Sequence, residues 1–391
     1  MDGRVEKLHK SMSEYRSGGE IMDIIAADSL NYKRWKTSNP FYGLIGSTVS
    51  IHNPKEFKAN YARNMIALLK KFGLKANRIS YCSSALAKKF FEVGAGYKEL
   101  ATFLSSFIES MREEVAVGVF YATCNPEKYP DTVIFTGEYD SGRTDTIPTI
   151  QFLRDWLSQY FVYVCAWKLT KCTKIYQKNF YLDGFRGPIT NAWNDLVKSN
   201  TISIFPLGDD CNAFVSFADL MARCVDEALR SRRLFLDEQK IQEALKGINF
   251  GEMHVHYCFH NDLQALVPLY KEDEKKSKTG KQIAVQNFRK RPIVFILKEG
   301  SKLIKEDTDW LKQTRFYDAV CNLAFELDAS VSFFGRLQDN ILEGDKIIYY
   351  GPKGQSKAKE IQELMKGVGR DIEFIYSKDL MEKYVVEKLK V

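Results

Sequence analysis

The feature that most constrains the fold is a regular alternation of strand and helix patterns between residues 175 and 233. Apolar and β-branched runs at 175–185 and 201–207 predict strands, and each is followed by a segment with apolar residues at helical spacing. The two helical segments cover 188–198 and 214–233. Strands that alternate with helices in this way favour a sheet that is parallel at least locally, with functional groups at the carboxyl ends of the strands. The sequence therefore predicts an α/β fold.

A β-hairpin and a helical segment are predicted before this stretch. Two strand patterns, one ending near Ser29 and one from Phe41 to Ser50, are joined by a polar loop. A helix is then expected from Pro54 to Gly73, with Asn53 as its N-cap. The remaining expectations before residue 175 are one or two helices over 83–114 broken near 94–96, a strand over 115–124, a loop over 136–148 and a long helix over 148–169.

The chain after residue 233 divides into three parts. A helix near 237–246 precedes a strand-like segment at 251–261. A polar stretch over 271–291 has the composition of a linker or mobile loop. From 292 onward, strand and helix patterns alternate over about 100 residues, which is long enough for a separate domain. The predicted domains are 1–247 with a helical insertion at about 52–114, a strand and basic linker over 248–292, and a carboxy-terminal α/β domain over 293–391.

Composition indicates a folded protein of a reducing compartment. Of the 391 residues, 45% are hydrophobic, which is enough apolar surface to offset the entropy lost on folding. The eight cysteines are scattered and predict neither a disulfide framework nor a zinc ribbon. The amino terminus lacks the apolar core of a signal peptide, and no apolar run approaches the roughly 20 residues of a membrane span. We therefore expect a cytoplasmic protein without a membrane partner.

Three aspartates are placed where a metal site is expected. Asp28 and Asp183 end predicted strands, and Asp219 lies on the helix that follows the strand 201–207. A carboxylate at the end of an apolar strand is costly to desolvate unless a cation or hydrogen-bond donor meets it. Mg²⁺ and Mn²⁺ take oxygen ligands, and a pair of such ions can activate water against a phosphodiester. The arrangement therefore indicates nuclease chemistry.

Short motifs around these aspartates carry a resemblance to a known fold. The motifs are Ala27-Asp28-Ser29, Tyr181-Leu182-Asp183-Gly184 and Ser216-Phe217-Ala218-Asp219-Leu220. In this order they resemble a widespread prokaryotic ribonuclease H-like family of unknown function, over about residues 20 to 232. The resemblance implies a ribonuclease H-like mixed sheet flanked by helices, to which we add the smaller carboxy-terminal open-sheet α/β domain. It also implies two-metal hydrolysis of nucleic acid with Mg²⁺ or Mn²⁺ held by Asp28, Asp183 and Asp219.

The sequence departs from the family pattern at three points. Asp28 is followed directly by Ser29 instead of glutamate, and Ser216 stands where the family has glutamine. A further glutamate expected within 77–84 is absent. Two alternatives follow. Either other acids complete the metal site, or the protein is a catalytically degenerate binding or scaffold protein. The other acids considered are Asp209, Asp210, Glu138 and Asp140.

Each candidate aspartate also has an ordinary structural explanation. On a helical wheel Asp219 falls beside Arg223 and away from the apolar face, so a solvated ion pair is an alternative. Asp183 precedes Gly184 and suits a strand-ending turn. Helix capping is preferred over catalysis for the acids and amide that precede the helix, which are Asp209, Asp210 and Asn212.

A second candidate site lies on the strand-like segment at 251–261. His254, His256, Cys258 and His260 alternate with apolar residues and so share one face of a strand. H-x-H on a strand can supply two ligands to Zn²⁺, although one ion cannot reach all four residues. A half-exposed polar strand face is the favoured alternative. The loop 351–356 likewise offers a weak nucleotide-phosphate site, for which an ordinary turn with Ser356 as N-cap is favoured.

Nucleic acid is the expected partner. The net charge is +7, and 271–291 alone holds eight basic and three acidic residues. Phosphate contacts are expected from this segment and from four other cations, namely Arg78, Lys88, Lys89 and Arg186. The sequence predicts no oligomeric state.

Overall fold

The computed structural model describes the chain in a series of ranges. The ranges are 24–34, 41–51, 53–124, 132–136, 144–148, 179–183, 201–205, 207–230, 253–259, 293–298, 311–333, 346–350, 359, 362–363, 366–367 and 373–386.

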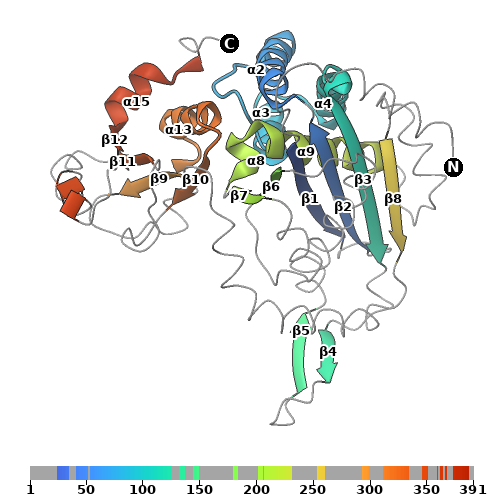
Figure 1. Cartoon of the computed structure of the whole chain (residues 1–391). Coiled ribbons are helices and arrows are strands. Elements are labelled where there is room, and N and C mark those ends of the chain that lie inside the picture. Colours follow the sequence, from blue (N-terminus) through green and yellow to red (C-terminus); the bar gives the residue numbers. More distant parts are fainter. Residues whose placement is uncertain are drawn as a thin grey trace, which may run out of the picture.

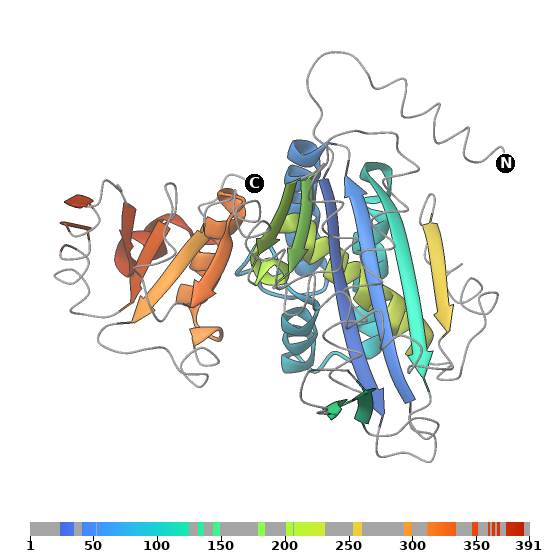
Figure 2. The same cartoon turned by 60° about the horizontal axis from the view of Figure 1, so that its bottom comes forward.

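A six-stranded mixed sheet is the largest element of the fold, with the order β7-β6-β1-β2-β3-β8. The strands are β1 (Ile24–Arg34), β2 (Phe41–Ile51), β3 (Val115–Cys124), β6 (Asn179–Asp183), β7 (Thr201–Phe205) and β8 (Met253–Phe259). β1, β2 and β3 pair antiparallel, whereas β6 pairs parallel to β1, β7 to β6 and β8 to β3. Figure 2 shows the sheet face, with β1 and β2 at its middle. The predicted hairpin and the locally parallel sheet are confirmed.

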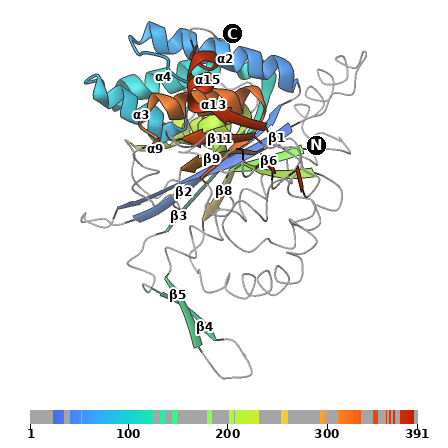
Figure 3. The same cartoon turned by 90° about the vertical axis from the view of Figure 1, so that its left-hand side faces the viewer.

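The helices described next to this sheet lie together on one of its faces (Figures 1 and 3). They are α2 (Pro54–Lys71), α3 (Ser83–Glu92), α4 (Tyr97–Glu109), the four-residue helix α8 (Gly208–Cys211) and α9 (Ala213–Arg230), with the single 3₁₀ turn η1 (Arg112–Glu114) before β3. Asn53 caps α2, because its Oδ1 accepts the Glu56 N–H at 3.2 Å, and Pro54 is the first helical residue. Gly94, with φ +78°, ends the segment after α3, and α4 begins beyond Gly96. The predicted cap and the break near 94–96 are confirmed.

The hydrophobic core lies between the sheet and these helices. α9 crosses β1 and β2, where the small side chain of Ser47 lets the helix approach and its Oγ donates to the Ala218 carbonyl. Aromatic rings from α2, α4 and α9 pack against one another within the helical layer. Ring centroids are 5.5 Å apart for Phe57–Phe214, 5.1 Å for Tyr61–Phe107 and 6.0 Å for Phe107–Phe217. Large aromatic side chains dominate the burial energy of such a core, so the helical layer holds the sheet from one side.

A second sheet follows in the carboxy-terminal part of the chain. It is fully parallel, with the order β10-β9-β11-β12. Its strands are β9 (Ile293–Lys298), β10 (Ser330–Phe333), β11 (Lys346–Tyr350) and β12 (Glu373–Tyr376), and the helices α13 (Arg315–Glu326) and α15 (Ser377–Lys383) belong with it. We call these elements the carboxy-terminal unit. The predicted open-sheet α/β arrangement of this region is confirmed.

Two boundaries differ from those predicted. β8 pairs with β3, so the segment that we placed with the linker belongs to the first sheet. The predicted loop over 136–148 includes strand β5 (Thr144–Pro148), which pairs antiparallel with β4 (Thr132–Thr136). Its alternating threonines favour a strand, which the polar turn residues before it obscured.

Several predicted elements lie outside the described residues. These are the helices over 148–169, 188–198 and 237–246, the helix from 356 apart from isolated helical residues, and the linker over 271–291. Within the described part of the chain, no helix has the length and apolarity needed to cross a membrane.

Candidate functional site

Three carboxylates from three different elements converge beside the carboxyl end of β6. Asp28 belongs to β1, Asp209 to α8 and Asp219 to α9. One oxygen from each lies within 4.8 Å of the other two. We call this group the acidic centre. The structure thus brings two of the three predicted metal ligands together and adds Asp209.

The strand register explains the position of Asp28. Residues Ile24 to Ala27 of β1 are buried, and Asp28 is the first partly exposed residue after them. Ala27 pairs with Leu182 of the parallel strand β6, so the next residues along the two strands are Asp28 and Asp183. Asp183 is the last residue of β6, but β1 continues past Asp28 to Arg34 because it stays paired with β2 along its whole length, so the prediction that Asp28 ends its strand is wrong. The two acids therefore lie side by side at the carboxyl end of β6.

Asp183 lies at the border of the acidic centre. Its Oδ1 accepts the Gly208 N–H at 2.8 Å, and its charge acts on both Asp209 and Asp219. Asp183 therefore holds the start of α8 next to the strand ends. The prediction that Asp183 ends a strand is confirmed. The Asp183 side chain contacts the turn that carries Asp209.

A left-handed residue directs the chain into α8. Leu207 has φ 57° and ψ 33°, a conformation that costs a non-glycine residue about 1 kcal/mol or more. The reversal after β7 turns Gly208 toward Asp183, and α8 follows at once. Asn212 then caps α9, because its Oδ1 accepts the N–H groups of Phe214 and Val215 at 3.0 and 3.2 Å. Capping by Asn212 is confirmed.

Asp219 is held by the amino terminus of α3. The Ser83 backbone N–H donates to Oδ2 of Asp219, and the Ser83 Oγ donates to its Oδ1 at 2.9 Å. Asp219 is only 3% exposed. The alternative of a solvated residue paired with Arg223 is therefore wrong, because α3 packs against the polar stripe of α9 that the helical wheel placed in solvent.

Burial and mutual repulsion disfavour ionisation at the acidic centre. Burial, opposed by the hydrogen bonds from Ser83 and assisted by Asp183 and Asp210, raises the pKa of Asp219 to about 6. Burial and the charges of Asp183, Asp210 and Asp219 raise the pKa of Asp209 well above its usual range. Acids arranged in this way are electrostatically unsatisfied without a counter-charge, which a divalent cation would supply.

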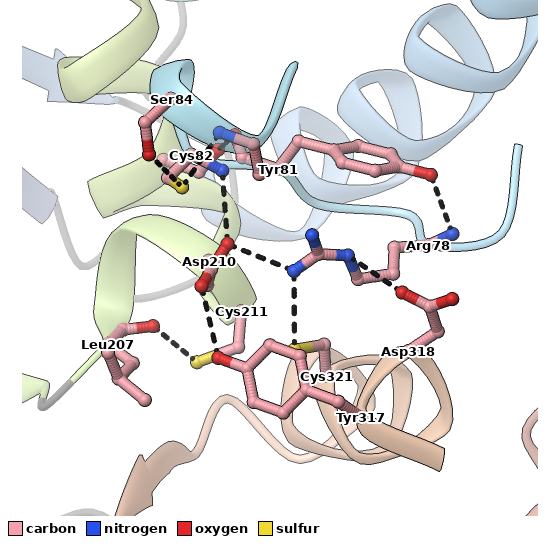
Figure 4. Close-up of polar contacts among 12 residues, drawn as sticks. Arg78, Tyr81, Cys82, Ser84, Leu207, Asp210, Cys211, Tyr317, Asp318 and Cys321 are labelled. Carbon is pink, nitrogen blue, oxygen red and sulfur yellow. Dashed lines mark hydrogen bonds and ion pairs between the residues drawn. The ribbon is translucent and has the colours of Figure 1, made fainter. Parts of the chain in front are cut away.

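Asp210 occupies a different environment from its neighbour Asp209. Its Oδ1 accepts from Nη1 of Arg78 at 2.9 Å, and its Oδ2 accepts from the Tyr317 hydroxyl at 3.0 Å (Figure 4). Burial raises its pKa, but the Arg78 charge and hydrogen bonds from Cys82 and Tyr317 outweigh that effect and hold it below the ordinary value. The structure therefore assigns Asp210 to a buried ion pair and not to the acidic centre.

The predicted phosphate contact by Arg78 is also wrong. Its side chain is buried, paired with Asp210 and with Asp318, whose Oδ1 is 3.1 Å from Nε. Lys88 lies on the exposed side of α3, 3.8 Å from Glu92, and Lys89 is half-buried with Nζ 5.7 Å from the centroid of the Tyr81 ring. Arg186, Lys275 to Arg291, Glu138 and Asp140 lie outside the described residues.

The histidine and cysteine strand is distant from the acidic centre. His254, His256 and Cys258 are alternate residues of β8, so the predicted strand is confirmed. β8 is three strand intervals from β1, which corresponds to about 14 Å at the usual spacing. The side chains of these residues, His260 and the loop 351–356 lie outside the described part of the chain. Zinc or nucleotide binding there stays a prediction.

Sequence reasoning named Asp209 only as one of four alternative acids and favoured helix capping for it, and it missed the contribution of Ser83. The available signal for Asp209 was an Asp-Asp pair in the turn that follows the strand β7. Ser83 carried the weaker signal of a hydroxyl residue at a predicted helix start.

Comparisons with known proteins give one family and one relative. The model of a family described as "Domain of unknown function (DUF8203)" matches residues 25–277, more than half of the chain. A protein of Archaeoglobus fulgidus described as "Uncharacterized protein" is 24% identical over 333 residues, which cover 83% of this chain and 91% of the relative. No solved structure matches the chain.

Proposed function

This chain belongs to the family described as "Domain of unknown function (DUF8203)", and we propose that it is a divalent-metal-dependent nuclease. The single observation that carries the proposal is the convergence of Asp28, Asp209 and Asp219, whose oxygens lie within 4.8 Å of one another. Asp28 is far in the sequence from the other two acids, and Asp209 and Asp219 have raised pKa values. Such a grouping disfavours three negative charges and favours a bound cation.

We further propose that the first sheet has the ribonuclease H-like fold that the motifs resemble. Support comes from the hairpin β1–β2, the placement of β6 and β7 on the other side of β1, and α9 across the middle strands. The acids also lie on the elements that carried the resemblance, with Asp28 on the first strand, Asp183 on the late strand and Asp219 on the last helix of that unit.

The acidic centre suits hard divalent cations. Carboxylate oxygens are the ligands that Mg²⁺ and Mn²⁺ prefer. Two oxygens bound to one ion by bonds of about 2.1 Å lie at most about 4.2 Å apart, so oxygens up to 4.8 Å apart suit two ions about 4 Å apart, or one ion after a slight closure of the centre. Asp28, Asp209 and Asp219 would hold the cation, which when bound would polarise a phosphodiester and lower the pKa of an attacking water. Asp183 would keep α8 in place through Gly208, and Ser83 would orient Asp219.

Nucleic acid remains the proposed substrate. Lys312 lies just before α13 and is partly exposed, and its positive charge acts on Asp209, opposing slightly the rise that burial causes in the pKa of that acid. We propose Lys312 as a phosphate contact in the place we had expected for Arg78. The basic segment 271–291 would add affinity that falls with salt concentration.

The test combines cation binding with cleavage. Purified protein should bind Mn²⁺ in a calorimetric titration and cleave at least one of single-stranded DNA, duplex DNA, RNA or an RNA–DNA hybrid when Mg²⁺ or Mn²⁺ is present. Asp28→Asn should abolish cleavage and weaken Mn²⁺ binding, whereas the matched control Asp379→Asn, at an exposed position on α15, should change neither. Cleavage that is equal in Asp28→Asn and wild type would refute the assignment.

A catalytically degenerate binding protein is the second candidate. The observation that favours it is that both oxygens of Asp219 already accept hydrogen bonds from Ser83, so fewer lone pairs face a cation. In that case the protein binds nucleic acid without cleaving it and binds nucleic acid equally well with Mg²⁺ or with EDTA. The same cleavage assay, run beside an electrophoretic binding assay, separates the two.

A further inference from the structure

The carboxy-terminal unit contacts the helix that carries Asp209. α8 has four residues, and its side chains divide between two environments. Asp209 belongs to the acidic centre, while Asp210 is buried against α13 through the Tyr317 hydroxyl. Cys211 lies in the same apolar cluster as Val320 of α13, and its Sγ is 3.6 Å from the Ala329 carbonyl oxygen. The helix α8 is thus shared between the first sheet and the carboxy-terminal unit.

A single helical turn does not hold itself in place. Fixing its backbone costs more conformational entropy than its one or two hydrogen bonds return, so short helices in proteins depend on tertiary contacts. The contacts of Asp210 and Cys211 therefore determine where α8 lies, and with it where the carboxylate of Asp209 points. Asp183 fixes only the first residue of the turn, through the Gly208 N–H.

Arg78 and Tyr317 provide the strongest of these contacts. They bind different oxygens of the Asp210 carboxylate, at 2.9 and 3.0 Å, and all three side chains are almost completely buried. Arg78 itself is fixed by the Asp318 carboxylate, by a 3.7 Å contact to Cys321 Sγ, and by the Tyr81 ring 4.8 Å from its guanidinium carbon (Figure 4). Charge-assisted hydrogen bonds of this kind are strong and directional, so Asp210 has little freedom to move.

We propose that Arg78 and Tyr317 are positioning residues, which set Asp209 in the acidic centre through Asp210 and so couple divalent-cation binding to the docking of α13. This inference rests on the proposed function, because it requires a cation at the acidic centre. The coupling is reciprocal: if docking of α13 favours cation binding, then a bound cation favours docking of α13 by the same factor.

The main experiment measures Mn²⁺ affinity of the full chain by titration calorimetry. Tyr317→Phe removes one hydroxyl and keeps the ring near Arg78, and we expect it to weaken Mn²⁺ binding about tenfold or more, as loss of groups that orient metal ligands generally does. The matched control is Lys58→Met. It breaks an ion pair of 2.8 Å with Asp328 in the contact between α2 and the carboxy-terminal unit. Because this pair is partly exposed and contributes at most about 1 kcal/mol to docking, Lys58→Met should weaken Mn²⁺ binding much less than Tyr317→Phe does.

A second measurement uses wild-type protein alone. Amide hydrogen exchange across 315–326 should slow when Mn²⁺ is added, because the cation stabilises docking of α13. Exchange unaffected by Mn²⁺, or Tyr317→Phe with wild-type Mn²⁺ affinity, would overturn the coupling while leaving cation binding intact. Equal losses in Tyr317→Phe and Lys58→Met would overturn the positioning role of Tyr317, since both variants would then report only how firmly α13 is docked. Wild-type protein that binds no Mn²⁺ would overturn both this inference and the proposed function.

Discussion

Replacing Asp219 with asparagine removes the most completely buried carboxylate of the acidic centre and keeps its shape. The folded-state pKa of Asp219 is about 6, against an ordinary value of 3.8. The difference is about two pH units, and each unit corresponds to about 1.4 kcal/mol, so the ionised carboxylate lowers the free energy of unfolding by about 3 kcal/mol. Since the folded pKa is raised, this stability is present below pH 4, is lost as the pH rises through 6, and stays lost above pH 7.

The assay is urea unfolding of metal-free protein between pH 4 and pH 8. Wild type should lose about 3 kcal/mol more than Asp219→Asn across that range. Removal of the Asp219 charge also lowers the pKa of Asp209, so the variant loses less stability from Asp209 than wild type does, and the difference between the two proteins grows. Mn²⁺ at pH 7.5 should then raise the melting temperature of wild type and not of Asp219→Asn.

The exposed variant Asp379→Asn is the control, and its pH dependence should match that of wild type. If Asp219→Asn showed the wild-type fall in stability between pH 4 and pH 7, burial would not be raising the pKa of Asp219, and the electrostatic argument for a cation would be refuted.

Three further predictions concern stability and are checked by urea unfolding at pH 7. Asn53→Ala should cost about 1 kcal/mol, because the Glu56 N–H loses its cap, and Asn64→Ala on the same helix should cost less, because it loses only a long hydrogen bond of 3.4 Å to the Ser110 carbonyl. Tyr61→Phe should cost about 1 kcal/mol, since its hydroxyl pairs with the Ser216 Oγ at 2.6 Å inside the core; a neutral result would mean that this bond contributes no net stability. Phe107→Ala should cost about 3 to 5 kcal/mol because it leaves a cavity among Tyr61, Phe103 and Phe217; a cost below 2 kcal/mol would show that the aromatic layer can collapse.

Local sequence signals predicted the parts of the fold that depend on neighbouring residues. The Asn53-Pro54 pair specifies a helix start by capping and by the fixed φ of proline, and the structure begins α2 there. The apolar run before Asp28 specifies a buried strand segment, and residues 24–27 of β1 are buried while Asp28 is partly exposed. These signals needed no knowledge of distant contacts.

Prediction of the acidic centre required knowledge of contacts between distant parts of the chain, which no local sequence pattern indicates. Asp209 and Asp210 are adjacent and chemically identical, yet one faces the other acids and one faces Arg78, which lies more than 130 positions earlier in the sequence. The sequence could not indicate that Leu207 adopts a left-handed conformation or that α13 lies beside α8. The helical wheel of α9 likewise showed a polar stripe at Asp219 but not the helix that covers it.

The sharing of α8 has a consequence for the order in which the protein is made. During synthesis, Asp28, Ser83, Asp209 and Asp219 have all left the ribosome about 100 residues before Tyr317 does. Until then, Arg78 and Asp210 can pair with each other, but Asp210 lacks the hydrogen bond from the Tyr317 hydroxyl and Arg78 lacks the ion pair with Asp318. Since domains generally form from the amino terminus as the chain emerges, the first sheet would be assembled before its third acid is fixed. A nascent or prematurely terminated chain would therefore contain the hydrophobic core without a working acidic centre, which delays any phosphodiester chemistry until translation has passed α13.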